Sequence, residues 1–509
     1  MSVSILSAAI QGIEAQKVDV EVDSTPGIHS LTIVGLPDKA VQESKDRIGS
    51  SIRNSGFVAP SSKNKKIIVN LAPADLKKEG PSYDLPIAIG YLYETGQIKF
   101  DPKNILFAGE LSLDGSLKAT NGVLAMAILA KKLNFKEIII PAQNAEEAAL
   151  VDGISIVPVG KIKDVVAHLD GTRRIQPFKL NGGTAGYGKT ENPFKFIKGQ
   201  EAAKRALCIA AAGGHNILMY GPPGAGKTLL AKAFAGILPP LSYEESIEVA
   251  KIYSSVGLFE KGMLVSRPFR NPHHTTSPPA IVGGGTWPKP GEISLAHRGV
   301  LFLDELPEFP RNVLESLRQP MEDGVVTVSR ASGSITLPAK FTLVAAMNPC
   351  PCGNYGDHKL SCSCSPFQVL KYRKRISGPL LDRMDIQINV SRETNMNKIG
   401  QDGEDIHSLS ESIRNAREIQ RKRFLNTALL TNSEIGHKNI DKFCFIESDA
   451  EKMLQRVVEL KSLSLRSYHK IKKLARTVAD LDGSSDIQQK HVAEAINLRL
   501  NEQSLTELS

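Results

Sequence analysis

The stretch from Gly221 to Thr228 reads Gly-Pro-Pro-Gly-Ala-Gly-Lys-Thr, and it constrains the fold more than any other part of the sequence. It matches the pattern G-x-x-x-x-G-K-[ST] at every fixed position and lies between an apolar run, 216–220, and a helical run, 229–238. A strand that feeds a glycine loop at the start of a helix directs backbone N–H groups at phosphate oxygens. The pattern therefore predicts a nucleoside triphosphate site, in which Lys227 reaches the β- and γ-phosphates and Thr228 holds Mg²⁺. The loop residues expected around the phosphates are Gly221, Pro222, Pro223, Gly224, Ala225 and Gly226.

The 509-residue chain is long enough for about three domains, and its hydrophobic content of 41% is that of a globular protein. Its apolar runs are too short to span a membrane, and its N-terminus lacks the pattern of a secretory signal. Six cysteines, four of them within fifteen residues, do not form the pattern of a disulfide scaffold, which favours a reducing cytoplasm. The net charge of +9 permits an anionic partner such as nucleic acid but does not require one.

Residues 1–170 are predicted to form an α/β domain, because strand-like alternation and helical spacing follow one another along this stretch. From 171 to 195 these patterns end, and the Gly-rich segment 181–188 predicts a flexible linker. The predicted strands are 18–22, 30–34, 66–70, 137–141 and 154–158, and the predicted helices are 38–51 and 122–133.

Two segments of this first domain resemble the Lon-type peptidase fold. Residues 79–84, Glu-Gly-Pro-Ser-Tyr-Asp, resemble its serine motif, and 109–141 resemble its second block. A Ser–Lys peptidase needs a lysine beside the serine to accept its proton, but the alignment places Met126 there. Lys131 and Lys132 lie more than one helical turn further on. The resemblance implies a Lon-like (S5-like) fold without peptidase activity.

Two later apolar runs end in polar residues that suit nucleotide hydrolysis. The run 300–303 reads as a buried parallel strand and leads into Asp304 and Glu305. Asp304 is expected to coordinate Mg²⁺ through water, and Glu305 to polarise the attacking water. The run 342–347 leads into Asn348, which resembles the sensor-one residue of AAA+ ATPases.

The resemblance to AAA+ ATPases is continuous from residue 196 to about 500, with the motifs in order. Residues 377–385, which contain Arg383, resemble the arginine-finger segment of the Mg-chelatase motor and of MCM helicases. Arg466 resembles the sensor-two arginine, and Arg476 is expected to be structural. Because a finger in this superfamily acts on the neighbouring subunit's nucleotide, the resemblance implies a ring. It also implies an AAA+ core over 196–395 and a helical lid of Mg-chelatase C-terminal type over 396–509.

Two insertions exceed a minimal ATPase. The segment 267–279 and the predicted β-hairpin 325–337 match the helix-two insert and the pre-sensor hairpin of the clade that includes MCM and the Mg-chelatase motor. In such rings both elements point into the pore. Arg330 near the hairpin tip either grips phosphates or is an exposed arginine on a structural hairpin. Adjacent histidines on an extended chain point to opposite sides, so a subunit or nucleic-acid contact is expected at 273–274 instead of a shared metal. The side chains proposed to contact DNA are Arg330, Arg270, His273 and His274.

A cysteine-rich loop, 350–364, interrupts the AAA+ order. It has little apolar content to fold around, and Zn²⁺ binds four thiolates tetrahedrally, so we expect a structural zinc. Unmetallated thiols or a disulfide remain alternatives, and His358 is a possible substitute ligand. The expected zinc ligands are Cys350, Cys352, Cys362 and Cys364.

Together, the Lon-like front, the Mg-chelatase-like motor and the cysteine loop resemble the YifB/ComM group of Mg-chelatase-like AAA+ proteins, over essentially the full length. The segments 348–353, 377–383 and 475–481 are specific to it. The resemblance implies a hexameric motor that uses ATP and Mg²⁺ on single-stranded or branched DNA, as a branch-migration helicase in recombination such as natural transformation. Two alternatives are a magnesium-chelatase-type motor, which lacks the Lon-like front and the cysteine loop, and a protein-remodelling unfoldase, which Met126 disfavours.

Overall fold

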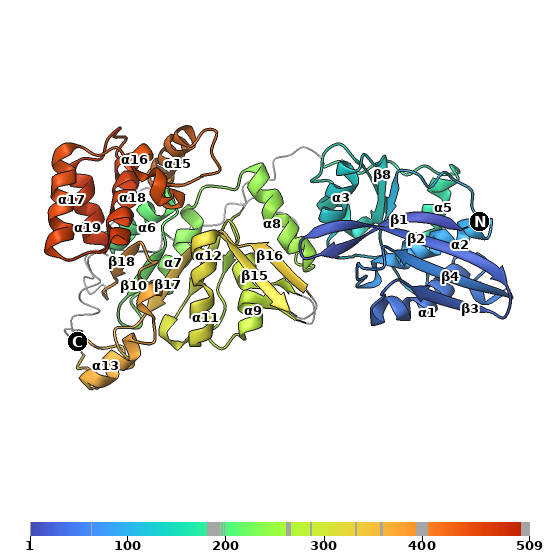
Figure 1. Cartoon of the computed structure of the whole chain (residues 1–509), viewed down its shortest axis with the longest axis horizontal. Helices are drawn as coiled ribbons and strands as arrows, with labels where there is room; N and C mark the ends of the chain where they lie inside the picture. The colour runs from blue at the N-terminus through green and yellow to red at the C-terminus, as the bar shows by residue number, and fades with distance from the viewer. Residues whose placement is uncertain are drawn as a thin grey trace. The chain divides into compact units, whose positions relative to one another are not determined.

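The chain folds into two compact units, each of which combines two separate stretches of sequence. Unit 1 comprises Met1–Gly186 and Tyr243–Leu264, and unit 2 comprises Tyr187–Ser242 and Val265–Ser509. Among the described helices, none combines the length and the apolar character that crossing a membrane requires. The computed structural model describes residues 2–62, 64–180, 194, 197, 199–260, 266–285, 288–330, 333–356, 360–392 and 406–499 (Figure 1).

Unit 1 is built on a seven-stranded mixed sheet in the order β3-β4-β2-β1-β5-β8-β9. The pairs β1–β2 and β2–β4 are antiparallel, whereas β3–β4, β1–β5, β5–β8 and β8–β9 are parallel. In β2, Val18, Val20 and Val22 are fully buried and alternate with polar residues, which is the period of a strand with one face in the core. The strands are β1 (Val3–Gln11), β2 (Glu14–Pro26), β3 (Ser30–Val34), β4 (Lys65–Ala72), β5 (Ile105–Phe107), β8 (Glu137–Pro141) and β9 (Ser155–Val159), with a small β6 (Glu110–Leu111) and β7 (Leu117–Lys118) pair.

The helices of unit 1 pack on this sheet, and α1 begins at a capping side chain. Asp38 caps α1 by accepting a hydrogen bond from the backbone N–H of Val41 at 2.8 Å. Asp84, fully buried at the start of α2, is paired with Arg47 of α1 at 2.9 Å, which ties the two helices together. The helices are α1 (Lys39–Asn54), α2 (Asp84–Glu94), α3 (Val123–Lys132), α4 (Ala145–Ala148), α5 (Ile162–Leu169) and α8 (Tyr243–Ser255).

Helix α8 belongs to unit 1 although its residues follow the glycine loop, 221–228, in the sequence. The carbonyl of Ser254 accepts a hydrogen bond from the N–H of Gly122 at 2.9 Å, just before α3. The Ser254 hydroxyl donates to the buried Glu147 carboxylate, which also accepts from the N–H of Leu124 at 3.1 Å. The chain therefore passes between the units three times, and not through a single linker.

Unit 2 contains a five-stranded, all-parallel sheet in the AAA-like order β11-β14-β17-β10-β18. β10 lies between β17 and β18: Met219 faces Ala346 on β17 and Ile388 on β18. Every residue of β14 is buried, as the continuous apolar run predicted. The strands are β10 (Ile217–Tyr220), β11 (Phe269–Arg270), β14 (Val300–Leu303), β17 (Thr342–Met347) and β18 (Ile386–Asn389).

Helices from both ends of unit 2 share one hydrophobic core, which joins the sheet to the C-terminal helical region. Two hairpins lie outside the sheet, β12–β13 and β15–β16. The predicted mixed α/β class with a C-terminal helical region is confirmed, while the predicted linker from 181 onward lies largely outside the described residues. The remaining elements are α6 (Glu201–Gly213), α7 (Lys227–Ile237), α9 (Pro278–Val282), β12 (Gly283–Gly284), β13 (Lys289–Pro290), α10 (Glu292–Leu295), α11 (Arg311–Ser316), α12 (Arg318–Asp323), β15 (Val325–Arg330), β16 (Gly333–Pro338), α13 (Pro366–Arg373), α14 (Gly378–Leu381), α15 (Ile406–Arg423), α16 (Ile440–Phe443), α17 (Ser448–Leu460), α18 (Leu465–Leu481) and α19 (Gln489–Arg499).

Candidate functional site

The glycine loop connects the end of β10 to the start of α7, as its sequence predicts. Gly226 caps α7 in the left-handed region, with φ of 90°. A Cβ at Gly221 would lie 2.0 Å from the carbonyl oxygen of Val390, so no larger residue fits there. The loop therefore packs tightly against the end of β18 and leaves the N-terminus of α7 to face a ligand.

Lys227 is the first residue of α7, and its amino group is held by three acceptors. It donates to the carbonyl oxygens of Gly221 at 2.6 Å and Pro222 at 2.9 Å, and to Oδ1 of Asn348 at 3.1 Å. Burial lowers the pKa of Lys227 below its usual value. Asn348 follows β17, so adjacent parallel strands bring these two predicted site residues together.

Thr228 and the two acidic residues after β14 form the second part of the site. The Thr228 hydroxyl donates to Oδ2 of Asp304 at 2.8 Å, which places two oxygen ligands side by side. Hydroxyl and carboxylate oxygens are the ligands that Mg²⁺ prefers, so this pair fits a magnesium ion. Glu305 has φ of 52°, and its half-exposed carboxylate lies 3.5 Å from Nδ1 of His274.

Arg392 is a site residue that the sequence pattern did not single out. Its guanidinium donates to the carbonyl oxygen of Pro223, in the glycine loop, through Nε at 3.2 Å and Nη2 at 3.1 Å. It follows β18, whose end lies beside the end of β10, where Tyr220 faces Asn389. The available signal was positional, because any cation just after β18 must lie at the phosphate-binding edge of the sheet.

The two arginines predicted to sense nucleotide lie together and share one acidic partner, Glu322 of α12. Arg383 Nη2 lies 2.8 Å from Oε2 of Glu322, and Arg466 forms an ion pair with Oε1 of the same carboxylate. Arg466 also pairs with Asp382 at 3.3 Å, and Arg383 donates to the carbonyl oxygen of Arg318 at 3.2 Å. None of these partners belongs to the glycine loop. Glu322 was not predicted from the sequence.

A buried ionic network fixes α18, and with it Arg466, against the sheet. Nζ of Lys470, in α18, lies 2.7 Å from Oδ1 of Asp385, the residue directly before β18. The ring of His215 lies 3.8 Å from Oδ2 of the same carboxylate, and the N–H of Asn216 donates to it at 3.0 Å. Burial alone raises the pKa of Asp385, but Lys470 and His215 outweigh it and hold that pKa well below its usual range.

The predicted geometry of the two adjacent histidines is wrong. The ring centroids of His273 and His274 lie 4.1 Å apart, so the rings do not point to opposite sides. The chain turns here, with the N–H of Thr276 donating to the His273 carbonyl at 2.9 Å, and the alternation of an extended strand does not apply. The described histidines and acids at this place do not form a cluster that could hold a metal ion. His274 instead lies beside Glu305.

Two further residues proposed to contact DNA differ in their surroundings. Arg270 forms a two-pronged ion pair with Glu292, at 2.6 and 2.7 Å. Arg330 ends β15 opposite Gly333, at the tip of the hairpin. Its side chain, like residues 331–332, lies outside what the structure describes. Arg476 is buried and donates to Asp480 at 3.0 Å, which agrees with the structural role expected for it.

The four cysteines of the loop 350–364 meet in space. Their sulfur atoms all lie within 4.8 Å of one another. Among the described residues, these four cysteines form a cluster that could hold a metal ion. The separations Cys350–Cys352, Cys350–Cys362 and Cys352–Cys362 are 3.3, 3.7 and 3.5 Å. Four sulfurs bound tetrahedrally to zinc at about 2.3 Å lie about 3.8 Å apart, so the cluster fits zinc. His358 lies outside the described residues.

Backbone groups around this cluster favour thiolates. The N–H of Tyr355 donates to the sulfur of Cys350 at 3.3 Å, and that of Cys352 to the sulfur of Cys364 at 3.4 Å. Backbone hydrogen bonds hold the pKa of the Cys352 thiol below its usual value. Such donors stabilise sulfur ligands in their deprotonated form.

In unit 1, Ser82 and Met126 are the two residues that the resemblance to the Lon-type fold compares with a Ser–Lys pair. Ser82 lies in a short 3₁₀ turn before α2, and its carbonyl accepts from the N–H of Gly109 at 2.9 Å. Met126 is 1% exposed and packs in the core of unit 1. The buried Lys78, which the pattern did not single out, donates to the carbonyl oxygen of Pro73.

Three family profiles match this chain in succession. The family described as subunit ChlI of Mg-chelatase matches residues 20–144, magnesium chelatase, subunit ChlI, matches 193–398, and magnesium chelatase, subunit ChlI C-terminal, matches 403–499. The match over 20–144 lies within unit 1 and the match over 403–499 lies within unit 2. The match over 193–398 lies in unit 2 except for residues 243–264, which belong to unit 1.

Full-length relatives are found as well. The chain is 44% identical to the competence protein ComM of Haemophilus influenzae over 518 residues, covering 100% of both proteins. It is 41% identical to YifB of Escherichia coli over 516 residues, covering 100% of this chain and 99% of YifB. It is 29% identical to the magnesium-chelatase 38 kDa subunit of Rhodobacter capsulatus over 175 residues, which cover 31% of this chain and 50% of that subunit.

The Asp385 network predicts how stability depends on pH. A carboxyl whose folded pKa lies below its unfolded value of about 3.9 contributes stability that is present above that value and is lost as the pH falls. Asp385→Asn should lower the free energy of unfolding by about 3 kcal/mol near pH 7, because Lys470 then lacks its buried partner. As the pH falls, the free energy of unfolding of this variant should decrease less steeply than that of the wild type. Urea unfolding between about pH 3 and 7 measures both effects.

The matched control is Asp449→Asn, which removes a carboxylate of α17 whose side chain is 74% exposed and pairs with Lys452. Surface pairs contribute little, so its stability should follow the wild type at every pH. Equal unfolding curves for Asp385→Asn and the wild type would contradict the assigned network.

Proposed function

This chain belongs to the YifB/ComM family of ATPases with magnesium-chelatase ChlI domains, and we propose that it is an ATP-driven ring motor that acts on DNA. Membership of this family implies ATP hydrolysis. The ring, the DNA client and the roles of individual residues are the further steps of the proposal. Its free thiols support a place in the reducing cytoplasm.

Bound MgATP supplies the cleavable phosphoanhydride bond and a cation that neutralises developing charge. Backbone amides of the glycine loop and the start of α7 bind the phosphates, and Lys227 exchanges its carbonyl partners for phosphate oxygens. Thr228 and Asp304, already joined by a hydrogen bond, hold the magnesium. Arg392 places a second positive charge beside the loop.

Glu305 and Asn348 position the water molecule that attacks the terminal phosphate. Glu305 orients the water and accepts its proton, a role that needs an accessible carboxylate, and its side chain is 52% exposed. His274, 3.5 Å away, restrains that carboxylate. Asn348 contacts Lys227 through Oδ1, so it lies where the terminal phosphate is held and helps to orient the water.

The observation that carries the ring proposal is the placement of Arg383 and Arg466. Both are anchored on Glu322, and neither has a described contact with its own glycine loop, whose Lys227 donates to Asn348. An arginine finger raises hydrolysis by about 10³–10⁵-fold, so a complete site needs one. We therefore assign both arginines to the nucleotide of the neighbouring subunit.

Shared sites predict that two inactive variants complement each other. Lys227→Ala lacks the phosphate lysine but keeps the finger, and Arg383→Ala lacks the finger but keeps the lysine. Each alone should hydrolyse ATP at least about 10³-fold more slowly than wild type. In an equal mixture about a quarter of the interfaces pair an intact loop with an intact finger, so a corresponding share of activity should return.

The control is the double variant Lys227→Ala/Arg383→Ala, mixed with Lys227→Ala. No subunit in that mixture has an intact loop, so no activity should return. A mixture of the two single variants that stays inactive, although native mass spectrometry shows mixed oligomers, would contradict shared sites.

DNA is the proposed client for two reasons. The full-length relative from Haemophilus influenzae is named a competence protein, and competence is the state in which bacteria take up DNA. The chain carries a net charge of +9, and the hairpin β15–β16 presents Arg330 at its tip. Backbone phosphate contacts of this kind are independent of sequence, which suits a moving motor.

Unwinding of branched DNA tests the proposal that the motor acts on DNA. Wild type with ATP should separate a labelled four-way junction, Lys227→Ala should not, and Arg330→Ala should be slowed about tenfold or more. Arg330→Lys, which keeps the charge, is the matched control. ATP hydrolysis that is insensitive to DNA, with no unwinding, would instead favour a magnesium-chelatase-type motor or a protein unfoldase.

We assign unit 1 to the Lon-like fold without peptidase chemistry. The support is Met126, which is buried in the core where a Ser–Lys peptidase needs a lysine. Its thioether cannot accept the proton of Ser82. Unit 1, including α8, then serves binding or assembly.

We also propose that the four-cysteine cluster holds a structural zinc. Elemental mass spectrometry of the purified protein should find about one zinc ion per chain. The variant Cys352→Ser/Cys362→Ser should lose this zinc, because the two remaining thiolates bind zinc weakly. Cys444→Ala, a buried cysteine outside the cluster, is the control and should keep its zinc. A folded wild-type protein free of zinc would remove the site.

A further inference from the structure

One face of α13 combines an exposed aromatic ring with positive charges. Phe367, Lys371 and Lys374 follow at helical spacings of four and three residues, so they share a face of α13 and its C-terminal end. Phe367 is 72% exposed. The opposite face buries Val369 and Tyr372. The aromatic ring and the lysines are therefore turned away from the core.

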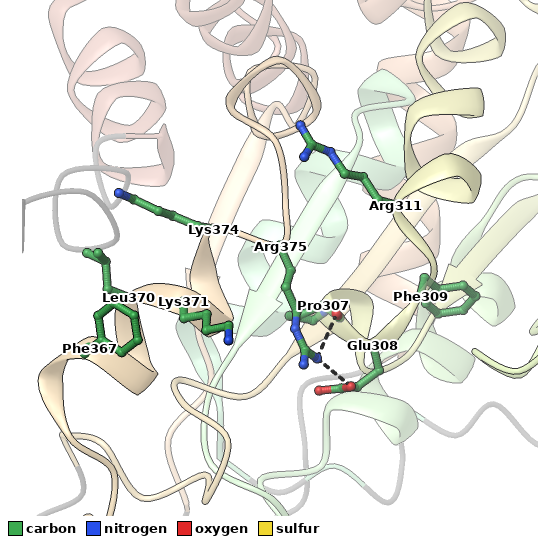
Figure 2. Close-up of a pocket in the computed structure, with 9 residues that line it drawn as sticks. All are labelled: Pro307, Glu308, Phe309, Arg311, Phe367, Leu370, Lys371, Lys374 and Arg375. Carbon is green, nitrogen blue, oxygen red and sulfur yellow. Dashed lines mark hydrogen bonds and ion pairs between the residues drawn. The ribbon is translucent and has the colours of Figure 1, made fainter.

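This face borders a cavity of about 720 Å³ in unit 2 (Figure 2). The opposite wall is the segment that directly follows Asp304 and Glu305, together with the start of α11. Four of its nine lining residues are cationic and one is acidic. The lining residues are Pro307, Glu308, Phe309, Arg311, Phe367, Leu370, Lys371, Lys374 and Arg375.

The positive charge in this cavity is not balanced from within. Arg375 neutralises the one acidic residue, since its Nη1 lies 2.7 Å from Oε2 of Glu308 (Figure 2). Within the described part of the chain, Lys371 and Lys374 form no ion pair. Cations that gather beside an exposed aromatic ring form the combination by which proteins hold single-stranded nucleic acid.

We propose that this cavity binds a single DNA strand, as a contact separate from the hairpin β15–β16. Lys371, Lys374 and Arg311 hold successive phosphates, and a base stacks on Phe367. Figure 2 shows the cationic ends spread around the rim, not meeting at one point, which fits an extended strand better than a lone phosphate ion. The inference rests on the proposed function, because it names a further site for the same client.

The cysteine loop supports the face that binds the strand. α13 starts directly after Cys364, with Ser365 as the cap that accepts from the backbone of the first turn. From the other end of the helix, Arg373 lies 5.1 Å from the ring of Tyr355 and donates to the carbonyl of Pro349 at 3.3 Å. Both contacts lie within or beside the loop that carries the four cysteines.

The test is DNA binding by the full chain, measured by fluorescence anisotropy of a labelled oligothymidylate over a series of salt concentrations. Lys371→Ala/Lys374→Ala should weaken binding about tenfold or more and reduce the salt slope by about 1.4, or about 0.7 for each lost phosphate contact. Phe367→Ala should weaken binding about tenfold without changing the slope. Phe367→Tyr should bind as wild type does.

The control removes two exposed cations elsewhere in unit 2, Arg421→Ala/Lys438→Ala, and should leave binding unchanged. If wild type binds DNA and Lys371→Ala/Lys374→Ala binds equally well, this inference falls and the proposed function stands. If wild type binds no DNA, both fall. If the lysine variant breaks the oligomer, the cavity is a subunit contact. If Phe367→Ala binds as wild type does, the cavity takes a simple anion and not a strand.

Discussion

The parallel pairing of β10 with β17 and β18 is the constraint on which the nucleotide site depends. Parallel strands end at the same edge, so the residues directly after β10, β14 and β17 must meet there. Lys227 then reaches Asn348 at 3.1 Å, and Thr228 reaches Asp304 at 2.8 Å. Arg392 arrives at the same loop from β18. Loss of this register would separate all of these groups together.

A second constraint holds Arg383 and Arg466, the two arginines proposed to sense nucleotide, on partners outside the glycine loop. Asp385 and Lys470 fix α18 on the sheet, and α18 begins with the turn that carries Arg466. Arg466 and Arg383 then converge on Glu322. Because Glu322 lies in α12, directly before the hairpin β15–β16, a movement of the hairpin would act on both arginines. Under the proposed function, one subunit would thus contain a physical route from the DNA that the hairpin contacts to the nucleotide of its neighbour.

The cysteine loop connects the nucleotide site to the cavity under α13. A Cβ at Gly353 would lie 2.5 Å from Cδ of Pro223, so the loop packs directly on the glycine loop. On its other side the loop holds α13 through Tyr355 and Arg373. A metal that keeps this loop rigid would let nucleotide and strand influence one another, which gives the cysteines a reason to interrupt the ATPase at this point of the chain.

Local sequence patterns were sufficient to predict many of the helices and strands and the functional residues that directly follow them. The glycine loop, the acids after β14, Asn348 and the four cysteines could be predicted, because each follows a strand or a spacing that chemistry requires. The histidine rings were misjudged, since a turn at Thr276 replaced the assumed extended chain. Glu322 has no local signal, because its two arginine partners are distant in sequence, and the signal for Arg392 is only its position after β18.

The sequence alone therefore determined the type of chemistry and the order of the elements. Tertiary structure decided which groups meet: that α8 packs in unit 1, that Arg383 and Arg466 share Glu322, and that Phe367 and its lysines face a cavity. The physical reason is that spacing along the chain encodes local conformation and burial. Contacts between distant segments depend on how whole elements pack, which no single stretch of sequence contains.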